Sequence, residues 1–120
     1  MKNILIIGDN IQEINKLRRV FGMEFKVSAT NSAESALEIL QSKAADLAVF
    51  RAGTDLGAIF DFYKSLRRKI SMNLPLLIIA PPDAAAILAD TVEMNNAAVV
   101  EATVPEARIL DVISSILGES

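Results

Sequence analysis

Short runs of apolar residues alternate with segments of helical periodicity along the chain. Five of these runs have the length and composition of β-strands, at residues 3–7, 25–29, 47–50, 76–79 and 98–100. The first run from Ile4 onward and the fourth run are continuously apolar, as expected of strands that helices cover on both faces. Strands and helices that alternate in this way predict βα units around a parallel sheet.

Helical spacing follows each strand. Apolar residues recur every three or four positions from Ile11 to Phe21, and Gly22 then predicts the end of that helix. Asn31 and Glu34 are three residues apart and have the form of a capping box. A second helix is therefore expected to begin there and to end near Ser42.

A third helix is expected to begin near Asp55 or Leu56 and to end in a basic cluster at residues 67–69, where cations suit the helix dipole. A second basic cluster, at residues 16–19, lies on the first helix. Both clusters lie beside apolar positions, and we interpret both as solvated helix surface.

Two further helices complete the pattern. Asp83 follows two prolines and is the expected N-cap of an alanine-rich helix that reaches about Met94. Thr103 and Glu106 form another capping-box pattern, with Pro105 in the first turn. They predict the start of a last helix with an apolar face.

These elements fit one α/β domain over residues 1–120. Because crossovers between parallel strands are almost always right-handed, five consecutive βα units predict a doubly wound parallel sheet with the strand order 2-1-3-4-5. Helices on both faces then give a three-layer, flavodoxin-like α/β/α fold. Loops that could bind a ligand lie at the carboxyl ends of the strands.

Composition excludes several classes of function. The chain has no cysteine and no histidine, which removes disulfides, thiolate metal sites and histidine-based catalysis. A net charge of −3 and a pI near 4.9 argue against a general nucleic-acid-binding surface. Because no apolar run approaches the roughly 20 residues of a membrane span and no secretory signal is present, we expect a cytoplasmic protein without membrane contact.

The predicted topology brings five positions together. Gly8 and Asp9 follow the first strand, and Arg51, Ala80 and Glu101 follow the third, fourth and fifth strands. The carboxyl ends of parallel strands meet at one edge of a sheet, so these residues should converge near the point where the strand order reverses. This edge is the candidate site.

The order, spacing and length of the elements resemble receiver domains of two-component signalling over essentially the whole chain. In receivers, two acidic residues after the first strand hold magnesium, and their positions correspond here to Gly8 and Asp9. The third strand of the family follows a proline- or alanine-aspartate pair, here Ala45 and Asp46, and ends at the aspartate that accepts a phosphoryl group. That position is Arg51 in this chain.

Two further positions of the family pattern also differ. The fourth strand of a receiver follows a proline, here Pro75, and ends in a serine or threonine, where this chain has Ala80. Pro105 resembles the start of the family's last helix. Counting back from it, the family's lysine position is Glu101 and its aromatic switch position is Ala98.

The resemblance therefore implies a degenerate phosphorylation pocket. Aspartyl phosphorylation needs a carboxylate nucleophile and a divalent cation held by several oxygen atoms. The guanidinium of Arg51 stays protonated and repels such a cation. We expect no enzymatic activity and no cofactor, and Asp9 is the one residual candidate for a magnesium ligand.

The family's aspartate and lysine become Arg51 and Glu101, which inverts the charge pair. We hypothesise that Arg51 bridges to Asp9, to Glu101 or to both, and that this bridge fixes the pocket in one state with little net gain in stability. Three alternatives remain open: Asp9 caps the following helix, Gly8 only eases a turn, or Arg51 and Glu101 both point to solvent.

The leading interpretation is a phosphorylation-independent pseudo-receiver of a signalling regulator that acts through protein contact, reaching nucleic acid only through an attached output domain. The resemblance places the surface for a partner or for self-association on the alanine-rich helix, the fifth strand and the last helix. Small residues on that helix would let another helix approach, although alanine also simply favours helix formation: they are Ala84, Ala85, Ala86 and Ala89.

An alternative function is a sensor of an anion or a phosphorylated metabolite, in which Arg51 and backbone N–H groups at helix starts bind the ligand. A nucleotide-binding enzyme of the same architecture fits less well. The first loop, residues 8–11, lacks the G-x-G-x-x-G pattern, and the chain has no P-loop sequence.

Overall fold

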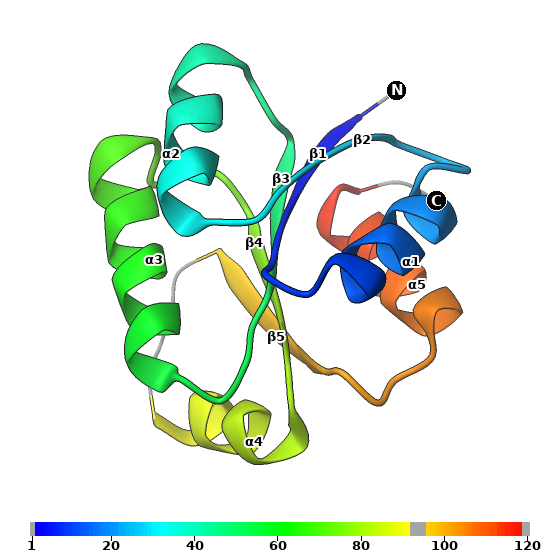
Figure 1. The fold of residues 1–120 in the computed structure, drawn as a ribbon, viewed down its shortest axis with the longest axis vertical. Helices are drawn as coiled ribbons and strands as arrows, with labels where there is room; N and C mark the ends of the chain where they lie inside the picture. Colours follow the sequence, from blue (N-terminus) through cyan, green and yellow to red (C-terminus); the bar gives the residue numbers. More distant parts are fainter. Residues whose placement is uncertain (1, 92–95, 119–120) are drawn as a thin grey trace.

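Parallel pairing of five strands organises the molecule (Figure 1). The computed structural model describes residues 2–91 and 96–118. Its strands are β1 (Asn3–Ile7), β2 (Lys26–Thr30), β3 (Leu47–Arg51), β4 (Leu76–Ala80) and β5 (Ala97–Glu101). They lie in the order β2-β1-β3-β4-β5 and all pair in parallel, which confirms the predicted doubly wound topology.

Helices cover both faces of the sheet. They are α1 (Ile11–Phe21), α2 (Ala33–Ser42), α3 (Leu56–Lys69), α4 (Pro82–Thr91) and α5 (Glu106–Ile116). α2, α3 and α4 lie on one face and α1 and α5 on the other, so the three-layer arrangement is confirmed (Figure 1). No helix in the described part of the chain combines the length and the apolar character that crossing a membrane requires.

Successive residues of the central strands divide their side chains between two cores. In β1, Ile4 and Ile6 join the cluster under α1 and α5, where Phe21 is fully buried. Leu5 and Ile7 join the cluster under α2, α3 and α4. This period of two explains why β1 reads as continuously apolar, since each of its faces is removed from water by a helical layer.

Three strands run one residue further than predicted. Arg51, Ala80 and Glu101 are the last residues of β3, β4 and β5, and not the first residues of the loops. The ladder continues because the register places Arg51 beside Ile79 and Ala80 beside Glu101. Arginine and glutamate are weak strand formers, so only the neighbouring strand, which supplies the hydrogen-bond partners, fixes these ends.

The bounds of β2 are shifted by one residue from the prediction. The N–H of Phe25 still donates to the carbonyl of Phe21 at 2.9 Å, which closes the turn after α1. The N–H of Lys26 donates to the carbonyl of Lys2 at 2.9 Å and begins the pairing with β1. β2 therefore begins at Lys26.

Two helix starts differ from the prediction. Ser32 and not Asn31 caps α2, and its Oγ accepts a backbone N–H three residues later at 3.1 Å. α4 begins at Pro82, one residue before the predicted cap Asp83, because proline has no N–H and suits the first helical position. The predicted end of that helix near Met94 lies outside the described residues.

The capping box predicted for the last helix does not form. α5 begins at Glu106, and Pro105 precedes it without a side-chain cap. The hydroxyl of Thr103 donates to Glu101 at 3.5 Å, and the carboxylate of Glu106 pairs with Lys16 of α1 at 2.7 Å. Both side chains have partners on other segments, and a pattern within one helix cannot reveal those partners.

Arg67 is buried, so its interpretation as helix surface is wrong: the residue is only 8% exposed. Its Nη1 donates to the carbonyls of Ser71 at 3.1 Å and Leu74 at 2.6 Å. Its Nη2 donates to the carbonyl of Asn96 at 3.1 Å, and its guanidinium carbon lies 5.1 Å from the centre of the Tyr63 ring. One side chain thus joins the end of α3 to the segments that lead into β4 and β5.

We expect Arg67→Met to lower the free energy of unfolding by about 2–4 kcal/mol, because it keeps much of the side-chain volume but leaves three carbonyls without this donor. Urea unfolding followed by circular dichroism measures the change. The matched control is Arg68→Met at the exposed neighbouring position, where a change within about 0.5 kcal/mol is expected. Equal losses in the two variants would contradict the assignment.

Candidate functional site

The five residues singled out in the sequence lie at the carboxyl edge of the sheet. Backbone hydrogen bonds hold this edge together beyond the strand ends. The N–H of Ala52 donates to Ile79 at 2.7 Å, and the N–H of Ala102 donates to Ala80 at 2.7 Å. The N–H of Gly8 donates to Thr30 at 3.1 Å. These hydrogen bonds hold the backbone in place at the points from which the candidate side chains extend.

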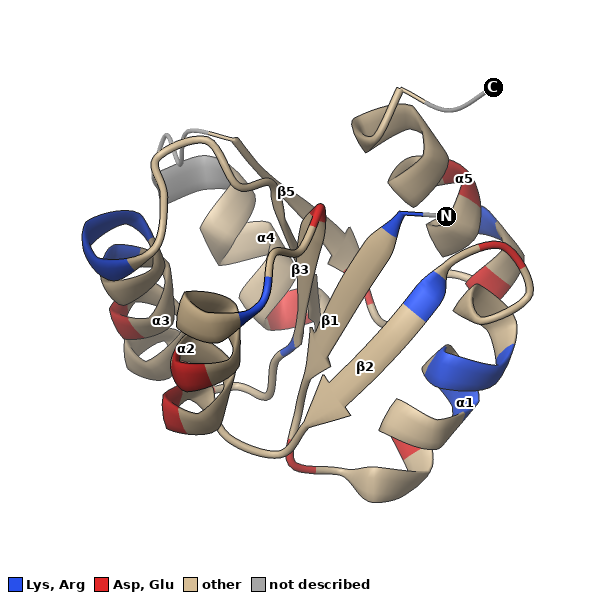
Figure 2. Ribbon diagram, turned by 90° about the horizontal axis from the view of Figure 1, so that it is seen from above, with Lys and Arg blue, Asp and Glu red and all other residues tan. Residues whose placement is uncertain are grey.

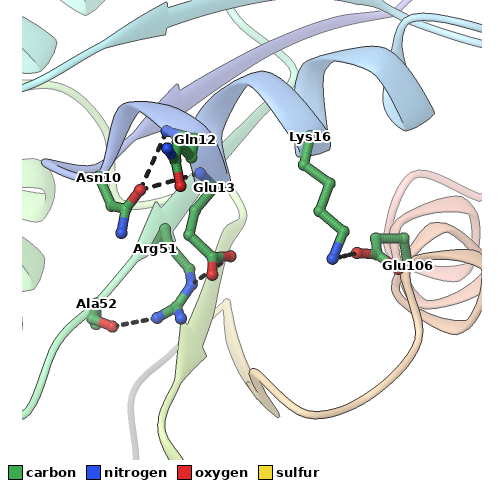
Figure 3. A network of polar contacts seen from close by, with 7 residues as sticks. All are labelled: Asn10, Gln12, Glu13, Lys16, Arg51, Ala52 and Glu106. Atoms are coloured by element: carbon green, nitrogen blue, oxygen red, sulfur yellow. Dashed lines mark hydrogen bonds and ion pairs between the residues drawn. The ribbon is translucent and has the colours of Figure 1, made fainter.

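Arg51 lies across this edge, and only 18% of its side chain is exposed. Figure 3 shows its guanidinium between two acceptors: Nη1 donates to the carbonyl of Ala52 at 2.6 Å, and Nε lies 3.6 Å from a carboxylate oxygen of Glu13. The hypothesis that Arg51 bridges to Asp9 or Glu101 is wrong. Among the described residues, its ion-pair partner is Glu13 on α1.

The first turn of α1 places Glu13. Asn10 is the N-cap of this helix, and its Oδ1 accepts the N–H groups of Gln12 and Glu13, each at 3.1 Å (Figure 3). The alternative in which Asp9 caps the helix is therefore wrong. Sequence reasoning missed Glu13, although an acidic residue three positions after a capping asparagine is a recognisable signal that its carboxylate lies at the helix start.

The space around position 8, and not only the turn after β1, favours glycine there. A β-carbon at this position would lie 2.7 Å from Cδ1 of Ile14 and 3.2 Å from the β-carbon of Arg51. Ile14 is buried, so its side chain has little freedom to withdraw. The first side-chain atom of any other residue at this position would therefore meet Ile14 and Arg51.

The other candidate residues add little to the polar chemistry of the edge. Ala80 is fully buried and brings no polar side-chain atom to the end of β4. Asp9 and Glu101 are exposed, and Glu101 accepts a long hydrogen bond from Thr103. The alternative in which the charged pair points to solvent thus holds for Glu101 and is wrong for Arg51.

Comparison of the sequence with protein families and with curated proteins finds no match. Comparison of the structure does find matches. The receiver domain of a Francisella response regulator superposes with a TM-score of 0.82 at 12% identity, with 98% of each chain covered. A receiver domain protein from Clostridium thermocellum gives 0.81 at 13% identity, with 98% of this chain and 95% of that chain covered.

The chain has the fold of a response-regulator receiver domain.

An adenylate cyclase from Rhodopirellula baltica shares the same fold, with a TM-score of 0.84 at 16% identity over 98% of this chain and 87% of that chain. Proteins with different names therefore share the receiver fold. Because a fold hosts many functions, the chemistry of this chain has to be argued from its own residues.

The residues at the edge of this receiver fold do not fit a magnesium ion. Magnesium binds near-octahedral sets of oxygen ligands and is usually held by one or two carboxylates with water. Of the three positions at which the family has acidic residues, only Asp9 keeps a carboxylate, because Gly8 provides no ligand and the cationic Arg51 fills the third. The nearby carboxylate of Glu13 pairs with Arg51. Within residues 2–91 and 96–118, no group of three acidic, histidine or cysteine side chains is placed to hold a metal ion.

A second ion pair links α1 to α5 beside the site. Nζ of Lys16 lies 2.7 Å from Oε1 of Glu106 (Figure 3). This contact lowers the pKa of Glu106, with a contribution from the residue's own backbone N–H, and it raises the pKa of Lys16. Lys16 is largely exposed, so salt screens the interaction.

The two shifts stabilise the fold over different pH ranges. For Glu106, whose folded pKa is lowered, the stabilisation is present above the pKa of an unfolded glutamate and is lost as the pH falls through the folded value. For Lys16, whose folded pKa is raised, it is present below the pKa of an unfolded lysine and is lost as the pH rises through the folded value.

We expect Lys16→Gln to raise the pKa of Glu106 back toward that of an ordinary glutamate, because the ammonium partner is removed. Carbon-13 NMR of the side-chain carboxyl during a pH titration measures this change. Arg19→Gln, which removes an exposed charge from the same helix, serves as the control and should leave the midpoint in place. An unchanged midpoint in Lys16→Gln would show that the ion pair is absent in solution.

We expect Gly8→Ala to lower the free energy of unfolding by about 1–3 kcal/mol, because the new β-carbon overlaps Cδ1 of Ile14. Ile14→Val removes that atom, so the same change should cost less in an Ile14→Val background. Gly53→Ala, at a neighbouring glycine with open space, is the control and should change the stability by less than about 1 kcal/mol. Urea unfolding of the four variants measures the coupling, and strictly additive losses would argue against the overlap.

Proposed function

We propose that the chain is a phosphorylation-independent pseudo-receiver domain of a cytoplasmic two-component-type signalling regulator, and that it acts through contacts with a protein partner and not as an enzyme. The observation that carries this proposal is the state of Arg51. It occupies the position at which the family has its phosphoacceptor aspartate, and it is largely covered and held by Glu13 and by the carbonyl of Ala52.

The pair of Arg51 and Glu13 supports a single fixed state of the edge. In a receiver, phosphorylation adds negative charge at this position and dephosphorylation removes it. Here a permanent cation at the end of β3 meets a carboxylate at the start of α1 without any added group. A guanidinium keeps its charge at all physiological pH values, so the pair cannot be switched by protonation of the arginine.

The same contacts weigh against the anion sensor. An incoming anion would compete with the carboxylate of Glu13 for Arg51, and Nη1 already donates to Ala52 at 2.6 Å. The exposed Asp9 adds a second negative charge to the same edge. We therefore rank anion binding below partner binding.

The proposed partner surface consists of α4, β5 and α5. β5 is the last strand of the sheet at that side, and Figure 1 shows α4 and α5 on opposite faces beside it. On α4, Ala86 and Ala89 are exposed and Ile87 is 46% exposed, so small and apolar side chains face outward. Ala84 and Ala85 are buried in the core, and these two do not belong to the surface.

A titration with magnesium and then beryllofluoride, a mimic of the aspartyl phosphate, tests phosphate independence. We expect no saturable change in the two-dimensional amide NMR spectrum at the edge or along β5 and α5, because no carboxylate accepts the mimic at position 51 and no oxygen cage holds the metal. Saturable shifts centred on Asp9, Arg51 and Glu101 would contradict the proposal.

A variant that regains the acidic residues serves as the positive control. It combines Gly8→Asp and Arg51→Asp with Ile14→Val, which makes room for the new side chain at position 8. With Asp9 it presents three carboxylates at the edge, and we expect magnesium-dependent shifts from it. Magnesium-dependent shifts in this variant, with none in the unsubstituted chain, would show that the chain lacks the acidic ligands and not the fold needed to bind the ion.

A further inference from the structure

The outer side of β2 is an open sheet edge. β2 pairs only with β1, and the described residues place no other strand beside it (Figure 2). The N–H of Lys26 donates to the backbone just before β1 at 2.9 Å, and the carbonyl of Thr30 accepts from the backbone just after β1 at 3.1 Å. Backbone groups alternate in direction along a strand, so those of Val27 and Ala29 point outward and are free to pair with another strand.

A hollow flanks this edge on each face of the sheet. On the α2 face, a groove of about 290 Å³ runs between β2 and the end of α2, and Lys26, Ser28 and Lys43 line it. On the α1 face, a hollow of about 240 Å³ is lined by Ala29 and Arg18, among other residues. Successive side chains of a strand point to opposite faces, so a strand added beside β2 would direct alternate side chains toward the two hollows.

Both apolar and basic side chains line the two hollows. Apolar side chains of β1 and α2, including Leu5, Ile39 and Leu40, line the groove on the α2 face. The exposed cations Lys26, Lys43 and Arg18 take part in neither of the ion pairs found among the described residues. This edge is therefore locally positive on a chain whose net charge is −3.

Two carboxylates lie close to the hollows, and neither forms an ion pair with these cations among the described residues. Asp46 accepts the backbone N–H of Asn3 at 2.7 Å and forms no ion pair among the described residues. Asp9 lines the hollow on the α1 face and is exposed. Three cations therefore face two carboxylates along the two hollows, and this net positive charge is complementary to an acidic partner.

We propose that the β2 edge binds an extended acidic segment of a partner protein, which adds to the sheet as a sixth strand. Its backbone pairs with the outward groups of Val27 and Ala29, its carboxylates lie near Lys26, Lys43 and Arg18, and its apolar side chains enter the two hollows. This surface lies at the opposite edge of the sheet from β5. The proposal is independent of the pseudo-receiver function.

The probe is a set of nine-residue peptides in which glutamate alternates with valine, leucine or phenylalanine. We expect at least one of them to bind the full chain with a Kd below about 1 mM at 50 mM salt and to bind less tightly as the salt concentration rises. At saturation, the amide protons of Val27 and Ala29 should exchange with solvent at least tenfold more slowly. The amide of Ser28, which already faces β1, should change little and is the internal control.

Two comparisons separate strand pairing from charge attraction. The double variant Lys26→Gln with Lys43→Gln should raise the Kd of the tightest peptide at least tenfold. The matched double variant Lys64→Gln with Lys69→Gln removes the same charge from exposed positions of α3 and should leave the Kd within about twofold. A peptide that is N-methylated at alternate residues, on the edge that would face β2, keeps its charge and should lose binding.

Several results would overturn the proposal. Failure of every alternating peptide to bind below about 1 mM would do so, and so would equal binding of the N-methylated peptide. Binding of heparin or RNA through the same lysines, without slower exchange at Val27 and Ala29, would show a general anion patch. Absence of any strand partner would leave Lys26 with the role of keeping an exposed edge from pairing with other copies.

Discussion

Burial of a parallel sheet on both faces is the constraint on which the rest of the structure depends. Each central strand contributes alternate side chains to two separate cores, so helices have to cover both sides. Right-handed crossovers between parallel strands then fix the order of the strands and bring every strand's carboxyl end to one edge. Residues as far apart in the sequence as Gly8 and Glu101 lie at this edge because of the topology, and no attraction between them is needed.

The chemistry at that edge differs from what the receiver fold accommodates elsewhere. Where the family pattern has two acidic residues and a phosphoacceptor, this chain keeps one acidic residue, Asp9. The other two positions hold a glycine whose β-carbon would meet Ile14 and an arginine held by a carboxylate of α1. The two changes are linked in space, because the β-carbon missing from Gly8 would touch both Ile14 and Arg51. Phosphate chemistry at this edge would therefore require several coordinated substitutions.

Two arginines illustrate how burial changes the role of one residue type. Arg51 lies near the surface. Its ion pair with Glu13 at 3.6 Å fixes the position of its side chain but adds little to the stability of the fold. Arg67 is almost fully buried and donates to three carbonyls in the segments that lead into β4 and β5, so its removal leaves acceptors without their partner. The first arginine orders the proposed site, and the second holds the opposite end of the sheet.

The sequence by itself determined the architecture. Apolar periodicity located the described strands and helices to within a residue or a few, and strand order followed from handedness. The start of α3 at Leu56 and the stop at Gly22 are where the pattern placed them. The predicted topology also brought the ends of the first, third, fourth and fifth strands to one edge of the sheet, where the structure has them. These features depend on residues that are close in the sequence or on the order of the strands and helices, so the sequence alone predicts them.

Only the tertiary structure decided which side chains pair. The partner of Arg51 is Glu13 and not Asp9 or Glu101, Glu106 turns to Lys16 and not to its own helix, and Arg67 is buried and not solvated. The physical reason is that these contacts depend on distance in space between the charged or polar groups and not on distance along the sequence. Long charged side chains bind whatever oppositely charged or polar group lies within a few ångströms, and those neighbours are set by how helices pack on the sheet and not by spacing along the chain.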